Sequence, residues 1–276
     1  MLTTTQFERA KRLALMLGGI ELAERHRVFL ERRCQRLGLL DGNQLDLLLG
    51  AVEGADPSAL RRFIGLVTTR HTSFFRHPLH FDLAARHALA AAHQGAPARL
   101  WSAGAATGEE PYSLAMTLIE MSGTGQPPAS ILASDLDQGA LAAAERGEYT
   151  TRAMSAIEAR RRTSFFSSVA PDRWSVAPVV RRLIEFRPIN LIDLTWPVEQ
   201  EFDVISCRNV LMYLEGSHRY AVLERMASLL SPEGLLFLDP AENLGAASQL
   251  FSPGPGNACY RRRVKFRNPG AAKRLI

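Results

Sequence analysis

The residues of this sequence best placed to hold a ligand lie in the segment LWSAGAATGEEPYS, at positions 100–113. The apolar residues before Gly104 predict a strand, and a helix with a proline in its first turn is predicted from Glu109 onward. Gly104 and Gly108 let the backbone turn sharply and approach a ligand closely, as in nucleotide-type sites. The alternative is an ordinary strand-to-helix turn in which two acids favour the helix dipole.

The charge of this loop restricts the ligand. No Lys follows Gly108, and Glu109 and Glu110 stand where a bound phosphate would have to lie. A ligand with positive charge or hydroxyl groups fits these acids better. S-adenosylmethionine (SAM), with its sulfonium, ammonium and ribose, is such a ligand, and Gly104, Glu109 and Glu110 are its candidate contacts.

Asp135 ends a second predicted strand in the sequence ILASDLD. An acid at this place in an α/β unit commonly binds the ribose hydroxyls of an adenosine ligand. The alternative role is a helix N-cap, which Asp137 is equally placed to provide. Because Asp135 is the acid at the strand tip, we predict that it binds the ligand.

A third strand ends in DVISCRNVLMYL, where the apolar run stops at Arg208 and Asn209. Ligands of open α/β sheets bind at the carboxyl ends of the strands, so Arg208, Asn209 and Tyr213 are candidates for the wall of the site. Tyr213 taken alone is better explained as an interfacial core residue.

The segment TTRHTSFFR, at positions 68–76, is unusual for a linker in its hydroxyls, aromatic rings and terminal Arg. Phe74 and Phe75 are expected to hold the two parts of the chain together. Thr72 and Arg76 are expected to reach over the crevice.

The order of predicted elements indicates a Rossmann-like parallel α/β sheet. Strands are expected at 99–103, 130–134, 202–206 and 234–239, and helices at 109–121, 138–146 and 217–230. The stretch between them is longer and richer in Arg than a crossover needs, so we expect an inserted subdomain at about 150–188. Two short strand-like stretches after Pro240 predict an antiparallel hairpin that closes the sheet.

The first 76 residues predict an all-α N-terminal domain with a linker, followed by a second domain at 77–276. Apolar residues recur at helical spacing, with breaks at 18–19, 41–43 and 54–57. A helix expected at 21–37 carries five arginines against three glutamates, which leaves one face positive. A solvated helix face is the simplest explanation of that charge.

Composition excludes several classes of protein. The 276 residues are 46% hydrophobic and 22% charged, as in ordinary globular chains. No apolar run approaches the roughly 20 residues of a membrane span, and no credible signal peptide precedes the first helix, so we expect a cytoplasmic protein without membrane insertion. Three distant cysteines fit neither zinc nor disulfides. A net charge of +5 without a nucleic-acid motif does not indicate nucleic-acid binding, and a monomer is the default.

Five segments, in this order and spacing, resemble the CheR-type chemoreceptor glutamate O-methyltransferases: TTRHTSFFR, LWSAGAATGEEPYSLAM, ILASDLD, the INL at 189–191, and FDVISCRNVLMYL. The resemblance covers about residues 7–265, and GEEPYS and CRNVLMY are its most specific blocks. It implies a helical N-terminal domain before a SAM-binding α/β domain with a small inserted β subdomain. The cofactor contacts that it implies fall on Thr72, Arg76, Glu110 or Glu109, Asp135, Asn190, Leu191, Arg208 and Asn209.

The resemblance also implies the reaction, in which SAM methylates glutamate side chains on the cytoplasmic domain of a methyl-accepting chemoreceptor. A glutamyl methyl ester and S-adenosylhomocysteine are the products. A glutamate with a pKa of about 4.3 is ionised at neutral pH and needs no general base. Arg76 and Arg208 are therefore expected to hold carboxylates, and Tyr213 is expected beside the reactive methyl group.

A docking role for the positive helix follows from the same resemblance, with Arg25, Arg32 and Arg33 as the expected contacts on the acidic receptor. In some members of the family the inserted subdomain binds a receptor C-terminal peptide. Arg70 and His71 depart from the usual family residues, as does FLDPAENLG where a Gly-His-Ser-Glu type of sequence is usual. These departures leave two alternatives: a SAM enzyme with another acceptor, and a non-catalytic signalling module.

Overall fold

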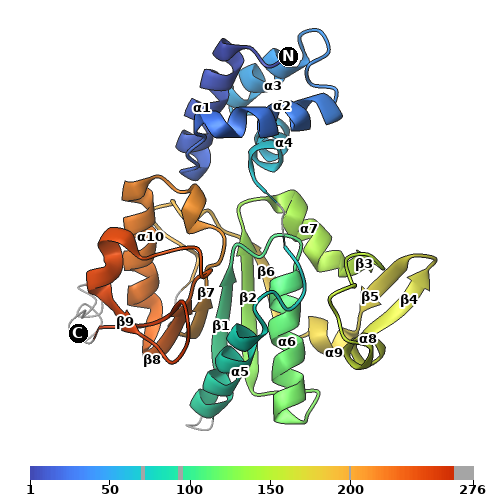
Figure 1. Cartoon of the computed structure of the whole chain (residues 1–276), viewed down its shortest axis with the longest axis vertical. Coiled ribbons are helices and arrows are strands. Elements are labelled where there is room, and N and C mark those ends of the chain that lie inside the picture. The colour runs from blue at the N-terminus through green and yellow to red at the C-terminus, as the bar shows by residue number, and fades with distance from the viewer. Residues whose placement is uncertain (70–71, 93–95, 199, 264–276) are drawn as a thin grey trace.

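A mixed seven-stranded sheet forms the centre of the computed structural model, which describes residues 1–69, 72–92, 96–198 and 200–263 (Figure 1). Its strands are β1 (Ala98–Ala103), β2 (Ala129–Asp135), β6 (Ile184–Pro188), β7 (Phe202–Ser206), β8 (Leu230–Phe237), β9 (Phe251–Pro253) and β10 (Cys259–Arg262). The order across the sheet is β6-β2-β1-β7-β8-β10-β9. The first five are parallel, and β10 is antiparallel to both of its neighbours. The predicted Rossmann-like sheet and its closing hairpin are confirmed.

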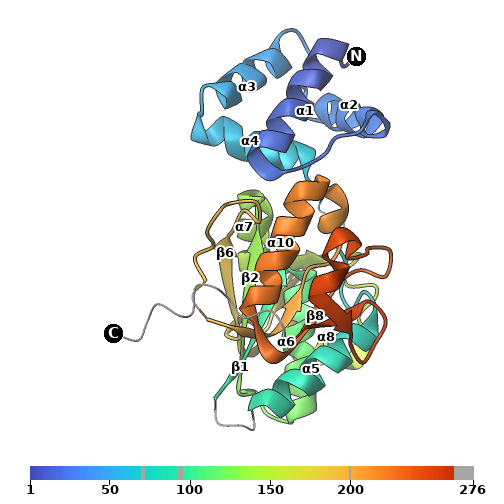
Figure 2. The ribbon, with the colours of Figure 1, turned by 90° about the vertical axis from the view of Figure 1, so that its left-hand side faces the viewer.

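Helices cover both faces of this sheet, because side chains alternate along each strand. They are α5 (Pro78–Ala92), α6 (Glu109–Ser122), α7 (Gln138–Arg146) and α10 (Gly216–Leu229). Leu100 of β1 packs with α5 and α6, whereas the next residue, Trp101, packs on the opposite face with α10, which is turned toward the viewer in Figure 2. Strands buried on both faces have the continuous apolar runs that made them predictable.

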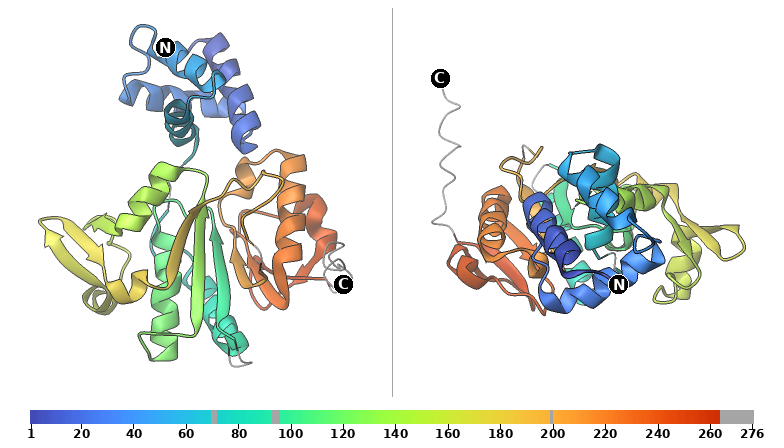
Figure 3. Two further views of the ribbon diagram at one scale, coloured as in Figure 1. Left: turned by 180° about the vertical axis from the view of Figure 1, so that it is seen from behind. Right: turned by 90° about the horizontal axis from the view of Figure 1, so that it is seen from above.

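A small three-stranded sheet projects to one side of the main sheet (Figures 1 and 3). It consists of β3 (Glu148–Thr150), β4 (Phe166–Ala170) and β5 (Arg173–Val176), flanked by α8 (Ala159–Phe165) and α9 (Pro178–Arg181). The insertion expected to reach residue 188 is shorter, because Ile184–Pro188 is β6 and pairs in parallel with β2. As a partly exposed edge strand, β6 lacks the apolar run of the inner strands.

Four N-terminal helices lie above the carboxyl edge of the main sheet and have a core of their own (Figures 1 and 3). They are α1 (Thr4–Gly18), α2 (Arg27–Arg36), α3 (Gln44–Glu53) and α4 (Pro57–Val67). The helix expected from residue 21 begins later, after a short 3₁₀ turn, η1 (Glu24–His26). The chain before it is held by a β-bridge between Ile20 and Leu214 and by the Glu21 N–H, which donates to the Tyr213 carbonyl at 2.8 Å.

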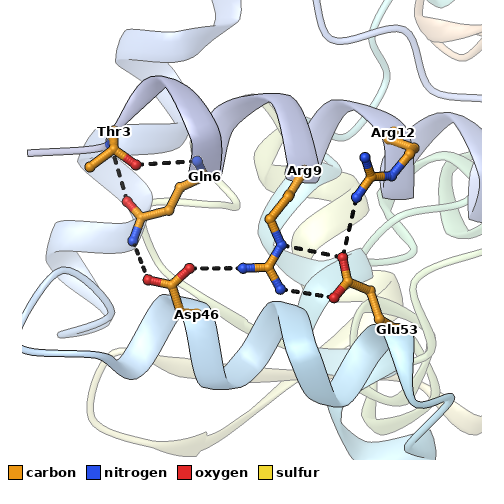
Figure 4. A network of polar contacts seen from close by, with 6 residues as sticks. All are labelled: Thr3, Gln6, Arg9, Arg12, Asp46 and Glu53. Atoms are coloured by element: carbon orange, nitrogen blue, oxygen red, sulfur yellow. Dashed lines mark hydrogen bonds and ion pairs between the residues drawn. The ribbon is translucent and has the colours of Figure 1, made fainter.

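Polar contacts join α1 to α3 (Figure 4). Arg9 donates to both carboxylate oxygens of Glu53, at 3.2 and 2.8 Å, and to Asp46 at 2.8 Å. Gln6 donates to the other oxygen of Asp46 at 2.7 Å. The planar guanidinium matches a carboxylate with two parallel hydrogen bonds, so these contacts set the position of α1 along α3.

Arg33 is not free for docking, contrary to the expectation from the resemblance. Its guanidinium donates to the Gly65 carbonyl at 2.6 Å and to the Thr68 carbonyl. The carbonyls at the end of a helix such as α4 lack helical partners, which favours a cation there. Arg25 and Arg32 are exposed and remain candidates for a docking surface.

The start of α6 provides a test of the glycine loop. Gly108 has a φ of +97°, and a Cβ atom there would lie 2.9 Å from both Ala144 Cβ and the Tyr149 hydroxyl. We expect Gly108→Ala to lower the free energy of unfolding by about 3 kcal/mol, because left-handed strain adds to crowding.

Gly123, at the other end of α6, is the matched control. Its φ is +66°, but no described atom lies within 4 Å of an added Cβ, so Gly123→Ala has the strain without the crowding. We expect a loss of about 1 kcal/mol for this variant. Urea unfolding followed by circular dichroism compares the two, and equal losses would contradict the crowding at Gly108.

Candidate active site

A cavity of about 300 Å³ lies between the carboxyl edge of the parallel strands and the N-terminal helices. Its walls come from the loops after β1, β2, β6 and β7, from the segment between α4 and α5, and from the end of α1. Ligands of open α/β sheets bind at this edge, and the volume suits a small organic ligand. Ten of the eleven predicted site residues line it: Thr72, Arg76, Gly104, Glu110, Asp135, Asn190, Leu191, Arg208, Asn209 and Tyr213.

Gly104 ends β1 in a turn that requires glycine. Its φ is +91°, and a Cβ atom would lie 2.2 Å from Val210 Cγ2 on the neighbouring loop. Its N–H donates to the Ser134 carbonyl at 2.8 Å, and the Ala106 N–H donates to Asp135 Oδ2 at 2.8 Å. These bonds hold the glycine loop against the tip of β2, so the two predicted ligand segments form one wall.

Glu110 and Arg208 form a buried ion pair at the centre of the site. Arg208 Nη1 lies 3.2 Å from Glu110 Oε2, and the two side chains are 3% and 15% exposed. The Ser102 hydroxyl donates to the other oxygen of Glu110 at 2.8 Å, and Arg208 Nη2 donates to the Arg76 carbonyl at 2.6 Å. Among the described residues, the buried Nε of Arg208 has no hydrogen-bond partner. A buried guanidinium is stable here because a carboxylate balances its charge.

Glu109, the predicted alternative to Glu110 as a cofactor contact, does not line the cavity. It is 7% exposed, and the Thr107 hydroxyl donates to its carboxylate at 2.7 Å. Burial raises the pKa of Glu109. Neighbouring residues of a helix point about 100° apart, so only one acid of the Glu109–Glu110 pair can face the cavity.

Asp135 and Asp137 divide the two roles considered for them. Asp137 Oδ1 accepts the Ala140 N–H at 3.0 Å and caps α7. Asp135 lines the cavity, and its two oxygens accept the N–H groups of Ala106 and Asp137, each at 2.8 Å. The carboxylate is thus oriented by the backbone at the strand tip, where a ligand hydroxyl can reach it.

The segment between α4 and α5 brings Thr72 and Arg76 to the cavity. The side chain of Arg76 is 36% exposed, and its Nη2 lies 3.6 Å from Asp239 Oδ2. Phe74 and Phe75 are buried in the core beneath α5 and α6. They anchor the linker to the sheet but not to the N-terminal helices. They were expected to join the two parts of the chain, and the structure shows only the first of these two attachments.

Tyr213 and Asn190 connect the sheet edge to the N-terminal helices. The Tyr213 hydroxyl accepts a hydrogen bond from the Thr69 hydroxyl at 2.9 Å, and its ring packs partly against the core of the helices. The Asn190 amide donates to the Leu17 carbonyl at 2.9 Å. Tyr213 therefore is both an interfacial residue and part of the cavity wall, the two roles considered for it from the sequence.

Sequence reasoning missed several residues of the site. Ser102 lies inside an apolar strand, and nothing in the neighbouring sequence predicts its contact with Glu110. Gly18 and Ile20 line the cavity only because α1 folds back onto the sheet. Glu242 could have been found, because it is an acid shortly after a strand that was itself predicted. Arg70 and His71 lie outside the described residues.

The cavity is built to bind and orient a ligand. Two carboxylates, Glu110 and Asp135, suit positive charge and hydroxyl groups, and two guanidinium groups, Arg76 and Arg208, suit a carboxylate. Burial raises the pKa of the neighbouring Cys207 well above its ordinary value, which keeps that thiol neutral. No cluster of His, Cys, Asp and Glu in the described part of the chain is arranged to hold a metal, and none of its helices is long and apolar enough to cross a membrane. The donor set fits SAM.

Comparison with known proteins identifies the family of the chain. A family model described as "CheR methyltransferase, SAM binding domain" matches residues 70–258. Chemotaxis protein methyltransferase 2 of Pseudomonas aeruginosa is 38% identical over 252 residues, which cover 90% of each chain. The chemotaxis protein methyltransferase of Escherichia coli is 34% identical over 259 residues, which cover 91% of this chain and 88% of that protein. The chain belongs to the CheR methyltransferase family.

Proposed function

We propose that this chain transfers the methyl group of SAM to glutamate side-chain carboxylates of methyl-accepting chemoreceptors, forming glutamyl methyl esters and S-adenosylhomocysteine. The observation that carries the proposal is the cavity at the carboxyl edge of the sheet, where Arg76, Glu110, Asp135 and Arg208 lie together. Membership of the CheR family and relatives named chemotaxis protein methyltransferases support it.

The roles of the cavity residues follow from their chemistry. Asp135, oriented at the tip of β2, is suited to the ribose hydroxyls. Glu110 is suited to the ammonium group, and Arg76 and Arg208 to carboxylates. When bound, SAM supplies an electrophilic methyl group on a sulfonium. Glu109 has no proposed role in binding, because its buried carboxylate is bonded to Thr107.

The acceptor needs little chemical activation. Its glutamate is ionised at neutral pH, with an ordinary pKa of about 4.3, so an oxygen can attack without a general base. The protein's task is to align the carboxylate with the methyl group and to remove water, and alignment alone supplies several kcal/mol. Arg76, with 36% of its side chain exposed, is accessible to an incoming carboxylate, and Tyr213 is placed to direct its second oxygen.

The exposed side of α2 is the proposed docking surface for the receptor. Arg32 is exposed on α2 and Arg25 on the turn η1 just before it, and Val28 and Phe29 are 56% and 38% exposed. The arginines complement the glutamates of a receptor helix in charge, and the apolar side chains beside them can pack on the apolar residues of that helix. We further propose that residues 1–76 act as the docking unit and its linker, and residues 77–276 as the methyltransferase unit with its insertion.

The central test is a methylation assay. Purified protein is incubated with tritiated SAM and receptor cytoplasmic fragments from the same organism, and base-labile methyl release is counted. We expect Arg76→Ala to lower kcat/KM about 100-fold, because it removes a charged group that orients the reacting carboxylates. Arg86→Ala, an exposed arginine on α5 away from the cavity, is the control and is expected to retain full activity.

Two outcomes would count against the proposal. No labelling of any receptor fragment by a protein that binds SAM in calorimetry would exclude the receptor as acceptor. No binding of SAM at high micromolar concentrations would instead favour the non-catalytic module.

The docking surface is tested by charge reversal. We expect the double variant Arg25→Glu, Arg32→Glu to raise KM for the receptor about tenfold, with the affinity for SAM unchanged, because both residues lie away from the cavity. The double variant Arg61→Glu, Arg62→Glu makes the same charge change on exposed residues of α4 and is the matched control. Equal rises in KM for the two variants would assign the effect to net charge and contradict a defined surface.

A further inference from the structure

Two acids just after β8 lie behind the site without lining it. Asp239 and Glu242 are 3% and 8% exposed, and neither belongs to the cavity wall. Buried carboxylates are costly unless they are hydrogen-bonded or paired with charge, so their partners indicate what they hold. They occur in FLDPAENLG, where the chain departs from the family pattern.

Glu242 holds the loop that carries three of the site residues. Its Oε2 accepts the N–H groups of Asn209 and Asp239, at 2.9 and 3.1 Å, and its Oε1 accepts the Met212 N–H at 3.2 Å. Asn209 and Met212 both line the cavity. One carboxylate therefore fixes the loop after β7 against the loop after β8.

Asp239 faces the side chains of Arg76 and His77 at the end of the linker. Its Oδ1 accepts the Ala241 N–H at 3.0 Å. Its Oδ2 is buried, has no hydrogen-bond partner among the described residues, and lies 3.6 Å from Arg76 Nη2 and 3.5 Å from His77 Nε2. Burial opposes ionisation of Asp239, but the Ala241 N–H, the Asn209 side chain, Arg76 and His77 together lower its pKa.

We propose that Asp239 is a positioning residue, which orients the guanidinium of Arg76 at the mouth of the cavity. The backbone of Arg76 is already held by Arg208, which donates to its carbonyl at 2.6 Å. The long side chain has many rotamers, and ordering it on binding costs free energy. The buried oxygen of Asp239 supplies the anchor, so that each arginine of the cavity has its own carboxylate: Glu110 for Arg208 and Asp239 for Arg76. The inference rests on the proposed function, in which Arg76 contacts SAM as well as the carboxylate of the acceptor.

The test is a double-mutant cycle with four proteins: the parent, Asp239→Asn, Arg76→Ala and the double variant. Calorimetry with SAM measures the affinity of each. We expect Asp239→Asn to weaken SAM binding about tenfold in the parent and less than about twofold when Arg76 is already Ala, because a residue that acts through Arg76 has nothing left to orient. The same loss in both backgrounds would assign Asp239 a general structural role and overturn the proposal.

A second measurement does not depend on the cofactor. In thermal unfolding without ligand, Asp239→Asn is expected to lower the melting temperature more in the parent than in the Arg76→Ala protein, and equal shifts would overturn the contact itself. If the parent bound no SAM, the proposed function would fail, while these melting temperatures would still decide whether the contact exists. Asp239→Ser provides the same cycle if the Asn variant does not fold.

The control is an acid of β8 itself, Glu233, whose Oε2 lies 3.2 Å from Arg261 Nη1 and which does not line the cavity. Glu233→Gln removes an Arg–carboxylate pair from the strand that precedes Asp239. We expect it to leave the affinity for SAM unchanged in both backgrounds. A tenfold loss from this variant would show that any charge removed from β8 weakens binding, and the assignment to Asp239 would fall.

Discussion

The guanidinium of Arg208 is bound at both of its terminal nitrogens, and the architecture of the cavity depends on this. One nitrogen meets Glu110 on the first turn of α6, and the other meets the Arg76 carbonyl at the end of the linker. Arg208 itself follows β7, so one side chain joins the glycine loop, the fourth parallel strand and the linker. A charge that is 3% exposed cannot shift without leaving its carboxylate unpaired, which costs several kcal/mol. The positions of three cavity walls are therefore tied to one ion pair.

The parts of the fold that depend on local pattern were predictable from the sequence. Inner strands such as β2 are buried on both faces and appear as continuous apolar runs, and glycines at left-handed positions mark the turn after β1. The parallel order then brings the strand tips together, which is why ten separated residues were placed correctly around one cavity. β6 was missed because a partly exposed edge strand has no such run.

The remaining errors concern contacts between distant segments. Whether Glu109 or Glu110 faces the ligand depends on the rotation of α6, which is set by packing against the sheet. Arg33 belongs to a helix that is positive in the sequence, yet its guanidinium binds backbone carbonyls at the end of α4. Asp239 and Glu242 follow a strand, which is a local signal, but their partners Arg76, Asn209 and Met212 lie 30 or more positions away, and no local pattern reveals those contacts.

The cavity draws its walls from the N-terminal helices as well as from the sheet, and this has a consequence for signalling. A ligand that touches Ile20 and Thr68 on one side and Asp135 on the other acts as packing between the two parts of the protein. Its binding free energy then strengthens the attachment of the helices to the sheet, by the linkage that applies to any ligand of the native arrangement. By the same linkage, a partner that holds the helices in this arrangement raises the affinity for the cofactor. Once the methyl group has been transferred, the ligand is a different molecule, and the coupling between ligand and partner changes with it. Binding of the receptor and binding of the methyl donor would in this way both affect the interface between the N-terminal helices and the sheet.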